Sequence, residues 1–219
     1  MIKVRVPNDT QRLSIVGATG SGKTQAALWH LSRRDYTEKP WIVIDFKYDE
    51  AINSIDGAYE MNINAPAPHH PGIYIVHPLP SQQMEVESLM WKIWAHENIG
   101  VYIDEGYMIG NNNEAFRTLL TQGRSKHIPL IVLSQRPVWM DRFVFSESEF
   151  FQVFRLQHRK DLAAVNDFIP FDLSERLPEF WSYYYDVGLN KLYKLSSVPD
   201  RNAILDTFNT RLRTLKKVV

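Results

Sequence analysis

Short hydrophobic runs rich in β-branched residues alternate along the chain with segments whose apolar residues recur every three or four positions. The runs have the length of buried strands, and the intervening segments have the period of helices that cover a sheet. Such alternation predicts an α/β fold with a mostly parallel, twisted sheet flanked by crossover helices. The strands are expected at Leu13–Val16, Trp41–Phe46, Gly72–Val76, Val101–Asp104, Leu130–Ser134 and Phe150–Leu156.

The helical segments begin and end at residues that commonly bound helices. Ser81 can cap a helix that runs to about Asn98, and Gly100 separates that helix from the next strand. Two runs joined by Gly188-Leu189-Asn190 predict a C-terminal β-hairpin, which a last helix follows. The hairpin strands are expected at Tyr183–Val187 and Lys191–Leu195, and the other helices at Lys23–Arg34, Glu114–Ser125, Asp161–Phe168 and Ala203–Leu215.

Length and composition limit the fold and its partners. The 219 residues suffice for one sizeable α/β core. We therefore expect a single domain over residues 1–219, with a core at about 12–168 and a C-terminal extension at about 169–219. The absence of cysteine excludes disulfides and thiolate metal sites. Lys+Arg and Asp+Glu balance at 25 each, so any contact with nucleic acid must be local.

Targeting segments are not evident in the sequence. The N-terminal residues lack the apolar core of a signal peptide. No apolar run approaches the roughly 20 residues that a membrane-spanning helix needs. We therefore expect no transmembrane segment.

A glycine-rich segment stands between the first predicted strand and the first predicted helix. Glycines there let the backbone amides wrap around phosphates, and the helix N-terminus adds a favourable dipole. Lys23 is expected to neutralise the β- and γ-phosphates of ATP, the Thr24 hydroxyl to bind Mg²⁺, and Gln25 to complete the nucleotide site. The segment matches the G-x-x-x-x-G-K-[ST] phosphate loop without deviation over Gly17, Ala18, Thr19, Gly20, Ser21, Gly22, Lys23 and Thr24. A chance glycine-rich turn is the alternative, and the position between strand and helix argues against it.

Two adjacent acids end the strand predicted at Val101–Asp104. Asp104 can hold Mg²⁺ through its waters, and Glu105 can polarise the attacking water. Paired acids at a strand end are common, but downstream of a phosphate loop they indicate nucleotide hydrolysis. The glutamate favours an ATP hydrolase over a nucleoside-phosphate kinase, which needs no water activator.

Gln135 follows the strand predicted at Leu130–Ser134, in the segment Ser134-Gln135-Arg136-Pro137. A polar side chain at the tip of a strand between the loop strand and the acid strand can touch the γ-phosphate and report its state. The alternative is a glutamine that only hydrogen-bonds a loop.

Taken together, these segments resemble the FtsK/HerA superfamily of ring-forming, DNA-pumping P-loop ATPases. Gly123–Pro137 is similar to that family's block of a basic helix end, a strand and a terminal Q-R-P. Ile44–Glu50 resembles its acid-x-lysine segment after the second strand, and Phe150–Phe168 its later strand and helix. The match runs in order from about Leu13 to Phe168. Its phosphate loop is shared by many P-loop families, whereas the Q-R-P block is more specific.

The resemblance implies a RecA-like core with strand order 5-1-4-3-2, and ATP hydrolysis at the subunit interfaces of a homo-oligomeric ring, expected to be a hexamer. It also implies an arginine finger from a neighbouring subunit, because a guanidinium can stabilise the charge of γ-phosphoryl transfer. Arg124, at a helix end in the family-like block, is the first candidate, ahead of Arg136 and Arg159. A solvated surface arginine is the alternative.

The sequence shows no membrane anchor, N-terminal barrel or winged-helix module of the cellular translocases. In this it is similar to the genome-packaging ATPases of tailless, internal-membrane viruses of bacteria and archaea. That likeness implies a motor that drives double-stranded DNA into a preformed capsid, with capsid vertex proteins as partners. It would act in the host cytoplasm or at the packaging vertex of the virion. The alternatives are a P-loop ATPase for virion assembly or secretion and a small-molecule kinase, against which the acid pair and Q-R-P argue.

Overall fold

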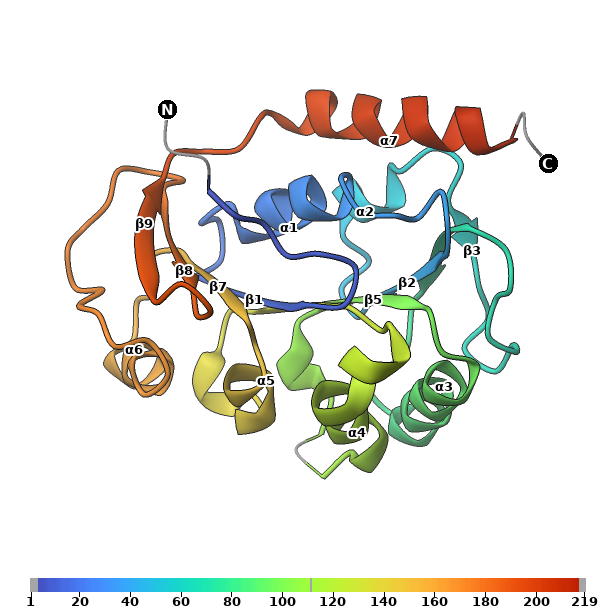
Figure 1. Ribbon diagram of the computed structural model, residues 1–219, viewed down its shortest axis with the longest axis horizontal. Coiled ribbons are helices and arrows are strands. Elements are labelled where there is room, and N and C mark those ends of the chain that lie inside the picture. The colour runs from blue at the N-terminus through green and yellow to red at the C-terminus, as the bar shows by residue number, and fades with distance from the viewer. Residues whose placement is uncertain (1–3, 111, 217–219) are drawn as a thin grey trace.

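The computed structural model describes residues 4–110 and 112–216 as one nine-stranded sheet with helices on both faces (Figure 1). The strands are β1 (Arg12–Val16), β2 (Pro40–Asp45), β3 (Tyr59–Glu60), β4 (Gly72–Val76), β5 (Gly100–Asp104), β6 (Leu130–Ser134), β7 (Phe150–Val153), β8 (Ser182–Asp186) and β9 (Lys191–Leu195). The helices are α1 (Lys23–Leu31), α2 (Glu50–Asn53), α3 (Gln83–His96), α4 (Glu114–Gln122), α5 (Arg142–Ser146), α6 (Arg159–Asn166) and α7 (Arg201–Lys216). Three short 3-10 turns complete the list, η1 (Gly106–Met108), η2 (Gly123–Lys126) and η3 (Pro137–Trp139).

The strand order is β3-β4-β2-β5-β6-β1-β7-β8-β9. Its middle part, β7-β1-β6-β5-β2, is parallel throughout. Numbered among themselves along the chain, these five strands follow the expected 5-1-4-3-2 order. The whole sheet differs from that order in detail. Strands β4 and β3 extend it beyond β2, and the antiparallel hairpin β8–β9 extends it beyond β7.

The central strands are apolar on both faces because helices cover both faces. Strands β1, β5 and β6 are buried along their whole length. Leu13, Ile15 and Ile131 pack in the same cluster as α1 and α7, whereas Val16 and Val132 pack in the cluster of α3 and α4. The sequence therefore shows nearly continuous hydrophobic runs at β5 and β6, whereas the buried polar residues Arg12 and Ser14 interrupt the run at β1.

The C-terminal helix α7 packs against the α1 face of the sheet (Figure 1). Phe208 is fully buried, and its ring stacks on that of Tyr36 at 5.7 Å between centroids. The Arg211 guanidinium lies over the Tyr36 ring and donates a hydrogen bond to the Ser32 carbonyl at 2.6 Å. Within the part of the chain that the structure describes, no helix is long and apolar enough to cross a membrane.

Several element boundaries differ from the sequence-based expectation. Helix α1 ends at Leu31 rather than near Arg34, and β7 ends at Val153 rather than Leu156. After β7 the backbone turns to the glycine-rich loop, and Ala18 N–H donates to the Arg155 carbonyl at 2.9 Å. Contacts between distant segments, which no local pattern encodes, set these ends.

Candidate active site

The glycine-rich loop between β1 and α1 has the backbone that a phosphate loop requires. Gly20 and Gly22 have φ angles of 75° and 94°, in the region that favours glycine. Gly17 has no room for a side chain, because a Cβ there would lie 2.6 Å from both Phe154 Cβ and Ser21 Oγ. The predicted loop Gly17–Thr24 is therefore formed as a tight turn that leads into α1.

Lys23 begins α1 and is buried. Its Nζ lies 3.7 Å from Glu105 Oε1, so an amine on α1 and an acid after β5 share one site. Burial lowers the pKa of Lys23, and the negative charge of Glu105 opposes that change. Its neighbours Thr24 and Gln25 are partly exposed and line a cavity of about 260 Å³ with Asp49.

Asp104 ends β5 and is 1% exposed. Burial, followed by the negative charge of Glu105, raises the pKa of Asp104 to about 7. Within the described residues, Asp104 Oδ1 is buried without a hydrogen-bond partner. A buried carboxylate oxygen that lacks a donor suits a hard cation such as Mg²⁺, which prefers oxygen ligands. Asp104, one of the two residues expected to hold the metal, thus offers an oxygen that suits it.

Glu105 is fully buried and has left-handed backbone angles, φ 59° and ψ 64°. A residue other than glycine is held in this region only where its surroundings determine it. Its Oε2 accepts the backbone N–H of Gln135 at 3.1 Å, and its Oε1 pairs with Lys47 Nζ. The carboxylate is therefore fixed between the ends of β2, β5 and β6.

Gln135 contacts the glycine-rich loop and the η1 turn through its side chain, in addition to Glu105 through its backbone. Its Oε1 accepts the Thr19 hydroxyl at 2.5 Å, and its Nε2 donates to the Tyr107 hydroxyl at 3.4 Å. The side chain thus lies between the glycine-rich loop and the η1 turn that follows the acid pair. The loop that this glutamine contacts is the glycine-rich loop itself.

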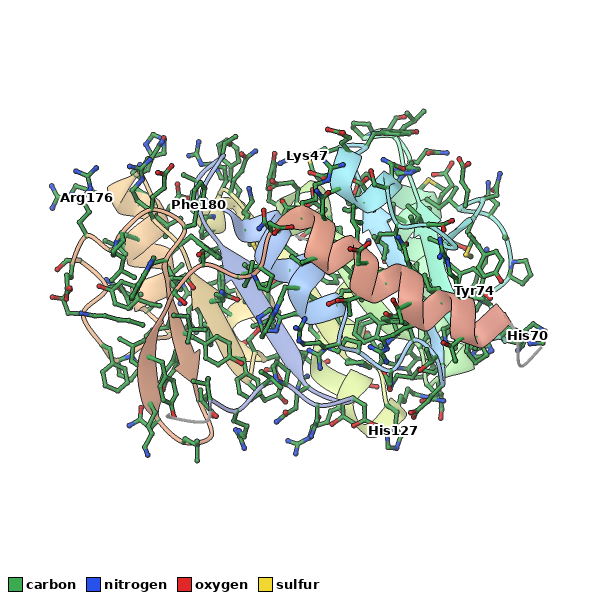
Figure 2. The ribbon with its side chains drawn as sticks, turned by 90° about the horizontal axis from the view of Figure 1, so that it is seen from above. Lys47, His70, Tyr74, His127, Arg176 and Phe180 are labelled. Carbon is green, nitrogen blue, oxygen red and sulfur yellow. The ribbon has the colours of Figure 1, made fainter. Side chains whose placement is uncertain are left out.

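Within the described residues, none of the three candidate arginines forms an ion pair with Asp104 or Glu105. Arg124 is exposed in η2, before β6, whereas the glycine-rich loop and Gln135 follow the opposite ends of β1 and β6. Figure 2 shows His127, the residue directly after η2, and Lys47 at opposite edges of the molecule. Arg136 Nε lies 3.3 Å from Asp161 Oδ2. Arg159 is exposed at the start of α6. A finger that serves a neighbouring subunit stays a prediction.

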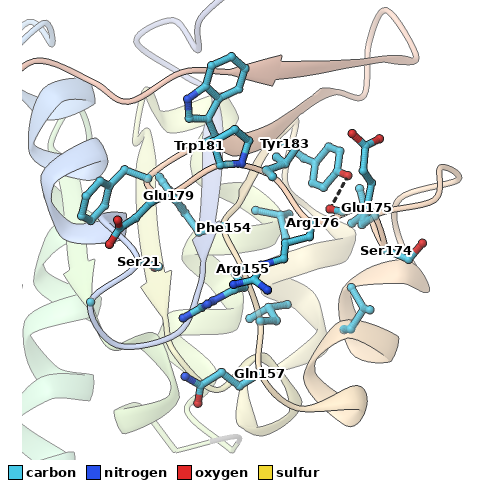
Figure 3. A pocket seen from close by; sticks show the side chains of 18 residues that line it. Ser21, Phe154, Arg155, Gln157, Ser174, Glu175, Arg176, Glu179, Trp181 and Tyr183 are labelled. Carbon is cyan, nitrogen blue, oxygen red and sulfur yellow. Dashed lines mark hydrogen bonds between the residues drawn. The ribbon is translucent and has the colours of Figure 1, made fainter.

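A large cavity that no sequence motif predicts lies beside the glycine-rich loop (Figure 3). This cavity of about 950 Å³ runs from Gly20 and Ser21 to the segment that precedes β8. A second cavity, of about 350 Å³, lies between Gly22 and the segment after β9. Phe180 borders both and is 47% exposed. Its place beside the loop depends on folding, so no sequence motif marked it.

Tyr183 closes part of the larger cavity. Its hydroxyl donates to the Glu175 carbonyl at 3.0 Å, which fixes the segment before β8 to the sheet. Arg155 extends from the end of β7 among the residues that line the cavity (Figure 3). The cavity therefore combines aromatic walls with cationic groups next to the loop.

The comparisons agree with this geometry. No protein-family model matches the chain. The chain is 49% identical over 217 residues to the DNA packaging ATPase P9 of Enterobacteria phage PRD1, covering 94% of this chain and 95% of P9. This confirms the expected genome-packaging relatives.

Solved structures with the same fold include another viral protein and a bacterial one. The genome packaging NTPase B204 of Sulfolobus turreted icosahedral virus 2, in complex with AMPPCP, superposes with a TM-score of 0.66 at 15% identity, over 88% of this chain and 100% of B204. VirB4 of Thermoanaerobacter pseudethanolicus gives a TM-score of 0.70 at 11% identity, over 90% of this chain and 92% of VirB4. At such identities the likeness shows the fold alone. From its identity to P9 over nearly the whole length, the chain belongs to the family of DNA packaging ATPases.

Proposed function

We propose that this chain hydrolyses Mg-ATP and uses that reaction to drive double-stranded DNA into a preformed capsid. The observation that carries the proposal is the meeting of Lys23, Glu105 and Gln135 at the carboxyl edge of the sheet. A phosphate-binding amine, a carboxylate and a polar strand tip lie there within hydrogen-bonding or ion-pairing reach. This is the set of groups that hydrolysis of a terminal phosphate requires.

The glycine-rich loop binds the triphosphate in this proposal. Backbone amides near Gly20, Gly22, Lys23 and Thr24 point at its oxygens, and the Lys23 amine neutralises the β- and γ-phosphates. Thr24 and Asp104 would hold Mg²⁺, and the buried Asp104 oxygen that lacks a donor supports this assignment. The bound ion supplies positive charge against the phosphate oxygens.

Glu105 and Gln135 carry out the hydrolytic step. The attacking water forms a bond to the γ-phosphorus while the bond to the β,γ-bridging oxygen breaks, and ADP leaves. Glu105 accepts the proton that the water loses. The Gln135 amide bonds the loop at Thr19 and so lies beside the phosphate that departs, where it can respond to that loss.

The aromatic cavity beside the loop suits the nucleotide base. Phe180 would meet a Cβ at Gly22 at 3.2 Å, so its ring lies directly against the loop. Base–aromatic stacking tolerates any base because every base has a π-face. We assign Phe180 to the base and the wider cavity to the sugar and its surroundings.

A ring of identical subunits, expected to be a hexamer, completes the motor. The acid pair has only lysines as cations near its carboxylates in the described residues, so a guanidinium from a neighbouring subunit would add the missing charge in the transition state. Arg124 is the first candidate because it is exposed and lies away from its own site. Such a ring would act at a capsid vertex, with vertex proteins as partners, in the host cytoplasm or on the virion.

The DNA motor is tested by measuring ATP turnover with and without double-stranded DNA, together with sizing in a non-hydrolysable analogue. We expect DNA to raise ATP turnover and the analogue to stabilise a ring. Lys23→Ala should lower turnover by roughly a hundredfold or more. Lys191→Ala on the exposed strand β9 is the matched control and should turn over normally.

ATP turnover that does not respond to DNA, together with a protein that stays monomeric, would contradict the proposed DNA motor. Stimulation by a small phosphate acceptor would favour a kinase instead. Turnover that responds to a membrane or scaffold protein and ignores DNA would favour an assembly or secretion ATPase.

A further inference from the structure

Lys47 reaches the acid pair from the neighbouring strand. Strands β2 and β5 are paired in parallel, with Asp45 beside Asp104, so the residues that follow them leave the sheet at the same edge. There the Lys47 ammonium pairs with Glu105 Oε1. Residues 58 positions apart in sequence are thus joined at the carboxylate that hydrolysis depends on.

The backbone at Lys47 is held by a buried acid. Asp45 is fully buried, and its two carboxylate oxygens accept the N–H groups of Lys47 at 3.0 Å and Asp49 at 2.8 Å. His77 Nδ1 lies 3.5 Å from the same carboxylate, and its ring stacks on Tyr48 at 4.1 Å. The loop after β2 is therefore shaped around Asp45, which directs Lys47 towards β5.

Two lysines share one oxygen of Glu105. Lys23 is the more distant, at 3.7 Å, with a side chain 6% exposed, while the Lys47 side chain is 39% exposed. A fully buried carboxylate needs a cation beside it, because an unpaired buried charge is costly. Without Lys47, Lys23 would be the remaining cation in the described residues that could serve, and it would be drawn away from the phosphates.

We propose that Lys47 is a positioning residue for ATP hydrolysis. It holds Glu105 in place at the edge of β5 and so leaves Lys23 free to bind the nucleotide. The inference rests on the proposed function, because it gives Glu105 the part of activating water. It adds a direct link from the loop after β2 to the hydrolytic carboxylate.

The test compares Lys47→Met with Lys47→Arg in the whole protein, with Lys191→Met as the control. In Lys47→Met we expect kcat to fall by roughly tenfold to a hundredfold, the loss typical of a misplaced catalytic group. The Kd of a fluorescent ATP analogue should rise in the same variant, by roughly threefold to tenfold, because Lys23 is then drawn towards Glu105 and away from the phosphates. Lys47→Arg keeps the charge and should recover most of kcat.

A double variant separates positioning from general damage. If Lys47 acts through Glu105, then Lys47→Met should lower turnover no further in a Glu105→Gln background. Unchanged or increased kcat in Lys47→Met would overturn the proposal, and so would a Lys47→Arg variant no better than Lys47→Met. Turnover that survives in the Glu105→Gln variant would instead contradict the part of the proposed function that assigns water activation to Glu105.

Discussion

The two sides of the glycine-rich loop are built differently. On the phosphate side, formed by the residues after β2, β5 and β6, charged groups are paired with one another, as the Lys47–Glu105–Lys23 contacts show. On the base side, formed by residues 173–183 and 196–200, the same loop faces open cavities bordered by Phe180. One side is dense with fixed charges, and the other is roomy and aromatic.

This difference separates the two tasks of the site. Fixed charges act on a reaction only when they are aimed before it begins, which is the condition for electrostatic catalysis. An aromatic wall binds its ligand through contact area and shape, and needs little such arrangement. Substitutions on the phosphate side should therefore lower kcat, while those on the base side should raise KM.

The largest effect is expected from Glu105→Gln. The amide keeps the shape of the side chain but cannot take a proton from water, so kcat should fall by roughly a thousandfold. Binding of an ATP analogue should remain within a few-fold of the wild type, because Lys23 and the loop amides are unchanged. Steady-state turnover and equilibrium binding measure the two quantities. Glu38→Gln, at an exposed position, is the matched control. Loss of binding without loss of kcat would contradict the division between the sides.

The phosphate side could be largely predicted from sequence because its chemistry fixes both residue type and spacing. Glycines at Gly20 and Gly22 are required by positive φ angles, and the acid pair stands at the end of β5, which only β6 separates from the loop strand β1. Gln135 was expected at the tip of β6, and it meets the loop there. The parallel order of the five middle strands followed from the same family pattern.

The base side could not be predicted, because distant segments make it. Phe180 belongs to an irregular stretch before β8, and only folding brings it against Gly22. Lys47 was visible as part of a family-like segment, but its pairing with Glu105 depends on the register of β2 and β5. Neither a tight turn nor a hydrophobic period encodes such contacts.

A second prediction sharpens the assignment of Gln135 to the phosphate side. Gln135→Ala removes the bonds to Thr19 and Tyr107, and we expect kcat to fall by about a hundredfold with KM little changed. Thr19→Val, which removes one of these bonds, should cost less. Single-turnover measurements would show whether the chemical step is the one affected. An effect confined to KM would show instead that Gln135 contributes to binding of the substrate and not to the chemical step.

A third prediction addresses the base side. Phe180→Ala removes the aromatic wall beside Gly22, and loss of base stacking should raise KM for ATP by about tenfold. The kcat should stay within about twofold, because the side chain contacts neither acid. Phe143→Ala, at another exposed phenylalanine, is the control and should leave both constants unchanged. A fall in kcat without a change in KM would show that Phe180 acts on the chemical step, and would contradict the division between the two sides.

The smallest expected effect is a change in the pH dependence of stability, caused by the buried His30 beneath the base side. His30 on α1 is buried and its Nε2 bonds Gln152 Oε1 at 2.9 Å, and Gln152 Nε2 in turn donates to the Ser182 hydroxyl at 2.9 Å. Burial, with the positive charge of Arg34 second, lowers the pKa of His30 to about 3. Neutral groups thus connect α1, β7 and β8, in contrast to the charges on the phosphate side.

The pH dependence follows from that depressed pKa. Above about pH 6.5 both folded and unfolded His30 are neutral, so its contribution to stability does not vary. Between pH 6.5 and 3 the unfolded chain binds a proton that the folded chain excludes. The free energy of unfolding should then fall by about 1.4 kcal/mol per pH unit as pH decreases. Urea unfolding at pH 7.5, 6.5 and 5.5 should show a shallower decline in His30→Gln than in His70→Gln, whose histidine is exposed. Parallel declines in the two variants would show that the buried histidine is not the acid-sensitive element under the base side.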